Sequence, residues 1–260
     1  MTDVVSIARR GRVAEIRLMR PDQMNTLDLD LAKALPAALA EVAQDGAVRA
    51  VILSGEGRTF MAGGDLACFR ADLEGAPATT KQLLDGFHTA IRLIATMSKP
   101  VIAAVQGPVA GGGIGLAFAC DLVVAAADAT FLSAYTKLGT SPDGGTTWTL
   151  TRLIGAKRAL AFVLLNDRMS AEEARGLGLV NLVVPAAELA SAANALAERI
   201  AAGSVGATAA AKRLVGLAGT GSLDAQLDAE LTAFASAART ADFREGITAF
   251  FERRPTRFPD

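Results

Sequence analysis

Residues 99–115 read KPVIAAVQGPVAGGGIG, and this stretch decides the fold class. Its first half contains a short apolar run, Val101–Val105, that predicts a strand, and Gly107-Pro108 ends that strand. A glycine triplet, Gly111–Gly113, then leads into an apolar segment near Ile114–Cys120 that predicts a helix. A strand that passes through a glycine-rich turn into a helix is typical of α/β proteins.

Strand and helix patterns alternate on both sides of this stretch, which predicts an α/β fold for the first three quarters of the chain. Further strands are predicted at Val4–Ile7, Val13–Met19, Ala50–Ser54, Leu122–Ala126 and Leu182–Val184. Helices are predicted at Leu29–Asp45, Thr79–Met97, Ala156–Leu165 and Ala171–Leu177. Pro36 lies inside the first of these helices and predicts a kink or a two-part helix. From about Glu188 the pattern is almost wholly helical, so we expect a core at residues 1–195 and a helical region at 196–260.

Composition excludes several classes of protein. The chain has 260 residues, of which 51% are hydrophobic and 20% charged, and its formal net charge is −1. This balance provides no basic field for nucleic acid or an anionic membrane, and no apolar run predicts a transmembrane helix or a signal peptide. Two cysteines without metal-ligand spacing, Cys68 and Cys120, are typical of reduced thiols in a cytoplasmic protein. A single histidine, His88, excludes a multi-histidine metal site.

Two glycine-containing segments can present backbone amides to a ligand: FMAGGDL at 60–66 and GPVAGGGIG at 107–115. Glycine lets the backbone approach a ligand with no side chain in the way. The second segment precedes a predicted helix, whose first N–H groups are free and whose dipole favours negative charge. Two such donors that converge on one oxygen form an oxyanion hole, although a glycine triplet before a helix is also typical of a tightly packed turn. The dinucleotide motif G-x-G-x-x-G and the phosphate loop G-x-x-x-x-G-K-[ST] are both missing from the sequence.

These segments occur in a fixed order with several others. The others are CDL at 120–122, LGTSPDGG at 138–145, RLIG at 152–155, residues 174–180 and FFERRP at 250–255. In this order, and over nearly the whole chain, the sequence resembles the crotonase (enoyl-CoA hydratase/isomerase) superfamily. The resemblance implies a crotonase fold of repeated ββα units, followed by a C-terminal helical region. It also implies a homotrimer, often stacked as a hexamer, in which the helical tail packs on neighbouring subunits. The apolar side chains at 223–251 fit such an interface, and packing on their own domain is the alternative.

By this resemblance, the backbone amides of Gly64 and Gly112 hold the carbonyl oxygen of an acyl-CoA thioester and stabilise its enolate. Further substrate contacts are implied at Arg20, Met24, Ala62, Asp65 and Leu66. The loop at 20–26 resembles the segment that lies near the adenine and pantetheine, where Arg20 is either a phosphate contact or a solvated loop arginine. Coenzyme A is part of the substrate, and no metal, cofactor or prosthetic group is implied.

The carboxylates at the acyl end depart from the pattern of the family hydratases. Those enzymes add water with two glutamates, and the matching positions here hold Gly115 and Tyr135. The carboxylate that remains is Asp143. Some crotonase-family isomerases, including ring-epoxide and oxepin-type phenylacetate isomerases, place a catalytic aspartate at the matching position, and so do the 4-chlorobenzoyl-CoA dehalogenases. An aspartate before two glycines is also a common turn residue or helix N-cap.

The resemblance therefore favours an isomerase in which Asp143 is both acid and base, because moving a proton between two carbons requires only one carboxylate. One alternative is a dehalogenase-like hydrolase in which Asp143 attacks the substrate and His88, at the matching histidine position, activates water. His88 is equally consistent with a capping or surface residue, and Tyr135 with packing on the acyl group or donating a hydrogen bond. A hydratase-type lyase and a non-catalytic CoA-binding protein are the remaining alternatives.

Overall fold

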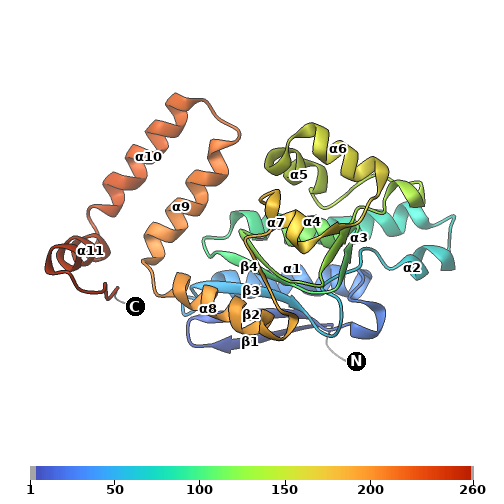
Figure 1. Ribbon diagram of the computed structural model, residues 1–260, viewed down its shortest axis with the longest axis horizontal. Helices are drawn as coiled ribbons and strands as arrows, with labels where there is room; N and C mark the ends of the chain where they lie inside the picture. Colours follow the sequence, from blue (N-terminus) through green and yellow to red (C-terminus); the bar gives the residue numbers. More distant parts are fainter. Residues whose placement is uncertain (1–3, 259–260) are drawn as a thin grey trace.

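Two β-sheets form the centre of the structure, a computed structural model that describes residues 4–258 (Figure 1). The strands are β1 (Val5–Arg10), β2 (Val13–Leu18), β3 (Ala50–Gly55), β4 (Val101–Val105), β5 (Pro108–Ala110), β6 (Leu122–Ala126), β7 (Thr130–Leu132), β8 (Met169–Ser170) and β9 (Leu182–Val184). The larger sheet has the order β1-β2-β3-β4-β6-β9, and only the β1–β2 pair is antiparallel. The smaller sheet has the order β5-β7-β8.

A repeated ββα unit links the two sheets. β4 and β5 lead into helix α4 (Gly112–Ala119), and β6 and β7 lead through the short helix η2 (Thr136–Leu138) into α5 (Thr146–Ile154). β4 pairs with β6 in one sheet and β5 pairs with β7 in the other, both in parallel. This confirms the predicted α/β fold and its ββα repeat. Because parallel neighbours end at the same edge, the segment after β5 and the segment after β7 lie beside each other.

Helices cover the larger sheet on both faces. The remaining helices are η1 (Pro21–Gln23), α1 (Leu29–Gln44), α2 (Leu66–Ala71), α3 (Ala76–Thr96), α6 (Ala156–Leu165), α7 (Ala171–Gly176), η3 (Ala186–Glu188), α8 (Leu189–Ala201), α9 (Val205–Ala218), α10 (Leu223–Ala237) and α11 (Ala241–Glu252). Strand β3 shows how the layers divide: Val51 and Leu53 belong to the main core, whereas Ala50 and Ile52 pack with α8. All six residues of β3 are buried, as expected for a parallel strand between two layers of helices.

Pro36 predicted a kink or a two-part helix. Helix α1 continues through Pro36 as a single element, so the second of these alternatives is wrong. Its apolar face includes Leu35 and Leu39, which are buried in the main core. Burying two leucines contributes roughly 3–6 kcal/mol, which outweighs the cost of about 3 kcal/mol for a proline inside a helix. The burial of the apolar face of α1 therefore outweighs the helix-breaking tendency of Pro36.

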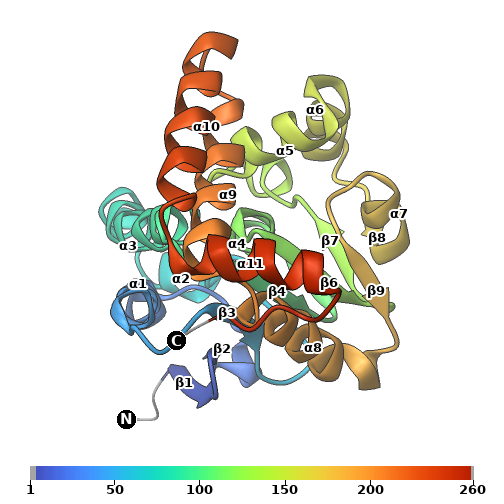
Figure 2. The same cartoon turned by 90° about the vertical axis from the view of Figure 1, so that its left-hand side faces the viewer.

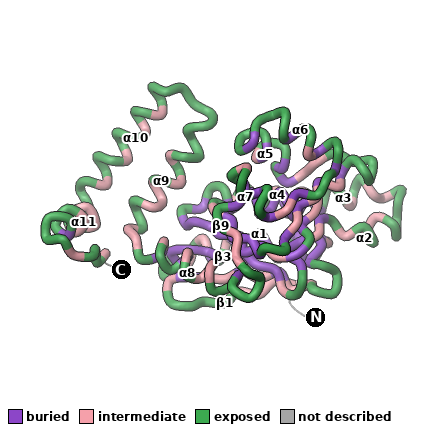
Figure 3. Tube along the Cα trace, viewed as in Figure 1, coloured by how far each residue is buried: buried purple, intermediate pink, exposed green. Residues whose placement is uncertain are grey.

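The C-terminal helices form a separate arm, as predicted from the helical pattern. Figures 1 and 2 show α9 and α10 as a hairpin that stands apart from the sheets, with α11 at the lower end of α10, opposite the turn of the hairpin. Figure 3 shows that most of this arm is exposed or half-buried. Lys212 on α9 anchors it: its Nζ donates to the carbonyls of Ile94 (2.7 Å) and Lys99 (3.0 Å) and pairs with Asp121 (2.7 Å). The predicted boundary at residue 195 lies inside α8, which packs on the larger sheet, and the division itself stays a prediction.

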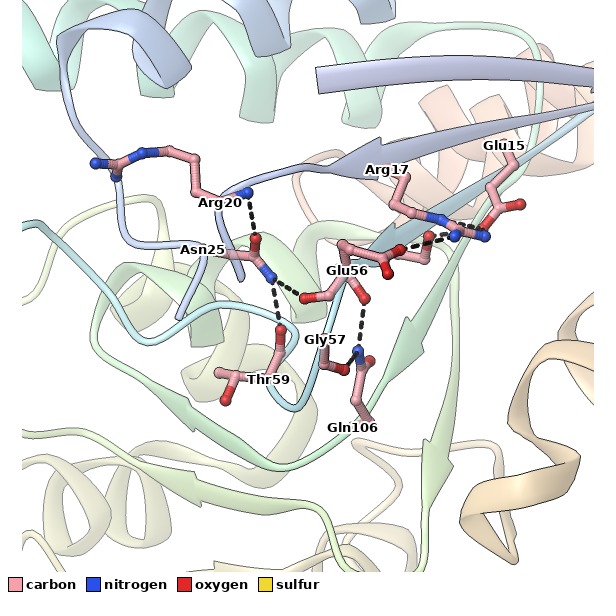
Figure 4. A network of polar contacts seen from close by, with 10 residues as sticks. Glu15, Arg17, Arg20, Asn25, Glu56, Gly57, Thr59 and Gln106 are labelled. Atoms are coloured by element: carbon pink, nitrogen blue, oxygen red, sulfur yellow. Dashed lines mark hydrogen bonds and ion pairs between the residues drawn. The ribbon is translucent and has the colours of Figure 1, made fainter. Parts of the chain in front are cut away.

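A buried asparagine fixes the loop that follows β2 (Figure 4). Asn25 is fully buried and has a left-handed backbone with a φ of 53°. Its side chain accepts a hydrogen bond from the amide of Arg20 (2.9 Å) and donates to the carbonyls of Glu56 (2.9 Å) and Thr59 (2.7 Å). Thr59 directly precedes the first glycine segment, so this side chain holds the 20–26 loop against the base of that segment.

Candidate active site

The two glycine segments lie against each other. The amide of Ala110 donates to the carbonyl of Met61 (3.3 Å). Gly63 has a φ of +94°, and a Cβ there would lie 3.1 Å from the carbonyl oxygen of Ala110. A Cβ on Gly111, which has a φ of +50°, would lie 3.6 Å from the Cα of Gly63. Glycine at 63 and 111 is therefore required both by the backbone angles and by the close approach of the two segments.

Strand-like pairing sets the direction of the Gly64 amide. Leu27 forms a parallel bridge with Gly64, in which its amide donates to the carbonyl of Gly63 (2.8 Å) and its carbonyl accepts from the amide of Asp65 (2.9 Å). Because the groups of neighbouring residues alternate along an extended backbone, the N–H of Gly64 points away from Leu27. Among residues 4–258, no group accepts a hydrogen bond from the Gly64 N–H.

The Gly112 amide is available for a different reason. Gly112 is the first residue of α4, and the first N–H groups of a helix have no partner within it. Across the described part of the chain, Gly112 donates no hydrogen bond, and the residue is buried. The helix dipole adds positive potential at this end. Both predicted donors are thus unused on two segments in contact, which leaves them able to bind an oxygen.

Asp143 lies next to Gly112. A Cβ built on Gly112 would lie 3.4 Å from Oδ1 of Asp143, and the same Oδ1 accepts a hydrogen bond from the hydroxyl of Tyr135 (2.8 Å). Burial raises the pKa of the Asp143 carboxyl, while the bond from Tyr135 and the nearby His88 act in the opposite direction. A carboxyl with a raised pKa beside the free amide of Gly112 is suited to exchange protons with a ligand held there.

His88 on α3 supports the turn that carries Asp143. Its Nε2 accepts a hydrogen bond from the amide of Gly144 (3.3 Å). Phe87, the preceding residue, is buried and lies close to both Gly112 and Gly144, where a Cβ on Gly144 would lie 2.5 Å from its ring. Phe87 was not among the residues predicted for the site, although it packs directly behind it.

The positions that hold glutamate in the family hydratases are closed to a second carboxylate. A Cβ on Gly115 would lie 2.8 Å from the carbonyl oxygen of Gly144 and 2.9 Å from Oγ1 of Thr146. Tyr135 is only 5% exposed, and burial together with the charge of Asp143 raises the pKa of its hydroxyl, so the phenol stays neutral. Thr146 was another residue missed from the sequence, because its contact depends on how α4 packs against the start of α5.

The predicted substrate contacts on the first segment have defined places in the structure. Met24 and Leu66 are exposed, at 47% and 53%, and the amide of Ala62 donates to the carbonyl of Met24 (3.1 Å). Asp65 caps α2 through the amide of Ala67 (3.1 Å) and pairs with Arg20 (3.1 Å). The Arg20 side chain is 12% exposed and also pairs with Asp28 and donates to the carbonyl of Thr26. Its predicted contact with a phosphate stays a prediction, since two carboxylates already balance its charge.

A large apolar cavity lies elsewhere, between the end of α3 and the helical arm. Its volume is about 970 Å³, and Trp148 of α5 reaches its wall. Arg152 stacks on Trp148, with 4.0 Å from its Cζ to the ring centroid, and donates to the carbonyl of Gly219 between α9 and α10 (2.5 Å). In the described residues, no three acidic, histidine or cysteine side chains are grouped to hold a metal ion. No described helix has the length and hydropathy to span a membrane.

Comparisons with known proteins agree with this geometry. The sequence model of the enoyl-CoA hydratase/isomerase family matches residues 8–260. The chain is 37% identical to 1,2-epoxyphenylacetyl-CoA isomerase from Escherichia coli, over 99% of this chain and 98% of that protein. It is 38% identical to a probable enoyl-CoA hydratase from Rhodobacter capsulatus, over 95% and 94%. The crystal structure of an enoyl-CoA hydratase from Polaromonas sp. JS666 matches with a TM-score of 0.94 at 35% identity, over 98% of this chain and 99% of that one. The chain has the crotonase fold and belongs to the enoyl-CoA hydratase/isomerase family.

Proposed function

We propose that this enzyme is an enoyl-CoA isomerase that isomerises a double bond or a ring next to a thioester, with Asp143 as its acid and base. The observation that carries the proposal is the lone carboxylate beside Gly112, with no room for a second one at Gly115. The similarity to 1,2-epoxyphenylacetyl-CoA isomerase also supports it.

For a 3-enoyl-CoA substrate, the steps balance with one group. The thioester oxygen accepts hydrogen bonds from the amides of Gly64 and Gly112, which stabilises the enolate more than the ground state. Asp143 removes a proton from C2, the C2=C3 bond forms as the C3=C4 bond breaks, and the protonated Asp143 returns the proton to C4. Each oxyanion donor contributes about 3–4 kcal/mol to the lowering of the barrier.

The contacts of His88 favour this reaction over hydrolysis by a dehalogenase-like mechanism. A histidine that activates water needs an unprotonated nitrogen directed at that water. Here Nε2 of His88 accepts a hydrogen bond from the amide of Gly144, so this nitrogen is directed at the Asp143 turn and not at a water molecule. Water addition is disfavoured separately, because it requires two acid–base groups and Tyr135 stays neutral.

Conversion of synthetic acyl-CoA thioesters tests the proposal. The purified protein is incubated with a linear 3-enoyl-CoA and, separately, with the 1,2-epoxide of phenylacetyl-CoA, and the products are separated by chromatography. We expect an isomer of unchanged mass from one of the two. Hydration of a 2-enoyl-CoA, or release of free coenzyme A, without isomerisation of either thioester would overturn it.

The pH dependence of the reaction follows from the environment of Asp143. The carboxylate must be ionised to remove a proton, and burial raises its pKa. We therefore expect kcat/KM to fall as the pH falls through a value above the usual range of an aspartate. The measurement is the pH profile of kcat/KM, which reports groups of the free enzyme. A profile that stays flat down to the usual aspartate range would contradict the assignment.

We also propose that the enzyme works as a homotrimer or hexamer in the cytoplasm. Helices α10 and α11 of the arm expose large apolar side chains: Leu227, Leu231, Phe234, Phe250 and Phe251. A monomer rarely leaves so much apolar surface in water, which supports an oligomer. The two cysteines are free thiols, which supports a location in the cytoplasm. We expect sedimentation equilibrium to give three or six times the 26.7 kDa of one chain, and Phe251→Asp to reduce that mass. A monomer at micromolar concentration would contradict the proposal.

A further inference from the structure

Tyr135 and Asp143 form a buried pair whose geometry distinguishes the two carboxylate oxygens. The Tyr135 hydroxyl donates to Oδ1 at 2.8 Å, and this oxygen also faces Gly112. Within residues 4–258, Oδ2 accepts no hydrogen bond. A carboxylate with one oxygen held in this way has a defined orientation, and its other oxygen, Oδ2, keeps both lone pairs available to receive a proton.

A strained backbone conformation at Ala134 sets the position of Tyr135. Ala134, the residue before it, has a φ of +62°, in the left-handed region that favours glycine. This conformation turns the chain sharply after β7, and the Tyr135 ring then lies against the second glycine segment, where a Cβ on Gly111 would be 4.0 Å from its Cζ. Strain of this kind persists where the surroundings require it, and it is concentrated at functional sites. Here the strained turn directs the phenol toward the carboxylate.

We propose that Tyr135 is a positioning residue, which holds Oδ1 of Asp143 so that Oδ2 takes the proton from the substrate and returns it. This inference rests on the proposed isomerase function and adds a role that the family comparisons do not assign. The hydroxyl keeps its own proton throughout, so the pair provides one acid–base group and no second one for adding water. The side chain thus orients the base and also limits the reaction to proton transfer between carbons.

Other titratable groups near Asp143 are few. From α3, His88 faces it through the Gly144 turn, and from the segment after β7 Tyr135 contacts it directly. Helix α4 approaches with Gly112, which has no side chain. A change in the titration of Asp143 when the hydroxyl is removed therefore reports mainly on the hydrogen bond from Tyr135.

Replacing Tyr135 by phenylalanine tests the role, because it removes only the hydroxyl and keeps the ring. With a substrate that the wild type isomerises, we expect kcat to fall about tenfold, the size of one hydrogen bond to a charged group, while KM stays within twofold. We also expect the acidic limb of kcat/KM to move to higher pH, since the lost hydrogen bond had lowered the pKa of Asp143. A side chain that merely fills space would leave the pH limb in place.

Ser133→Ala is the matched control. Ser133 is fully buried in the same segment, and its hydroxyl has no hydrogen-bond partner among the described residues. Its removal should leave both kcat and the pH limb as in the wild type. A Tyr135→Phe variant that behaves like Ser133→Ala would overturn the proposal.

A measurement without substrate separates this inference from the isomerase assignment. The titration of Asp143 is followed by carboxyl ¹³C NMR, and its signal is identified by its loss in Asp143→Asn. We expect Tyr135→Phe to shift this titration to higher pH even if neither thioester proves to be a substrate. An unshifted titration would refute the pairing itself, whereas a shifted titration without any isomerisation would refute only the proposed reaction.

Discussion

Asp143→Asn should reduce isomerisation by about 10²–10⁴-fold, because one group performs both proton transfers and an amide can perform neither. The loss should appear in kcat, with binding of a CoA thioester changed by only a few-fold, since Gly64 and Gly112 still hold the carbonyl oxygen. Folding should be preserved, because asparagine has nearly the same shape and can still accept the hydrogen bond from Tyr135. The measurements are single-turnover rates with excess enzyme and the Kd of a CoA thioester by calorimetry.

The control for this variant is Asp128→Asn, which makes the same chemical change at an exposed position between β6 and β7. It should keep the rate of the wild type within twofold. If Asp143→Asn also kept its activity, Asp143 would be only a turn residue, and another group would have to move the proton. If the wild type and Asp143→Asn both bound the thioester and neither converted it, a non-catalytic CoA-binding protein would become the better description.

Much of the fold could be predicted from the sequence, and its failures have a common physical cause. Two apolar runs of five residues, Val101–Val105 and Leu122–Ala126, gave correct bounds, and the predicted Val13–Met19 and Ala50–Ser54 differ from the strands by one residue each. The missed strands, β5, β7 and β8, have only two or three residues each and include Pro108, Thr130 or Ser170, whereas β9, also of three residues, is wholly apolar and was predicted. Their positions depend on pairing with one another, and pairing between segments far apart in the chain cannot be inferred from the local sequence.

The candidate site was predictable in its residue types but not in its contacts. The sequence indicated Gly64, Gly112 and Asp143, and the structure brings Asp143 next to Gly112. For Tyr135 the sequence allowed two roles, packing on the acyl group or donating a hydrogen bond. The structure shows a hydrogen bond to Asp143. The sequence could not reveal that Gly115 has no room for a carboxylate, because the obstruction comes from Gly144 and Thr146. A missing glutamate can be seen in a sequence, but a site closed to one requires coordinates.

Gly113→Ala should clearly destabilise the protein, because a methyl group there meets backbone atoms of the other glycine segment. Gly113 is buried in α4, and a Cβ there would lie 2.1 Å from the carbonyl oxygen of Met61 and 2.9 Å from its carbonyl carbon. These are backbone atoms, so the clash is relieved only by moving the two glycine segments apart. Overpacking of this kind costs about 1–3 kcal/mol. We expect the free energy of unfolding, measured by urea titration, to fall by at least that amount.

The matched control for stability is Gly216→Ala on α9, where a Cβ would meet no atom within 4 Å. Because alanine is favoured over glycine inside a helix, this variant should gain about 0.5–1 kcal/mol. The comparison separates the effect of a methyl group in a helix from the effect of the contact with Met61.

Activity under conditions where Gly113→Ala stays folded then tests the oxyanion hole. Gly112 precedes the substituted residue, and Gly64 lies on the segment that the methyl group displaces, so the two amides should no longer reach one oxygen together. Loss of one such donor costs about 10²–10³-fold in kcat. A folded Gly113→Ala protein with the rate of the wild type would mean that the contact between the segments does not set the spacing of the donors, and the enolate would have to be stabilised by other groups.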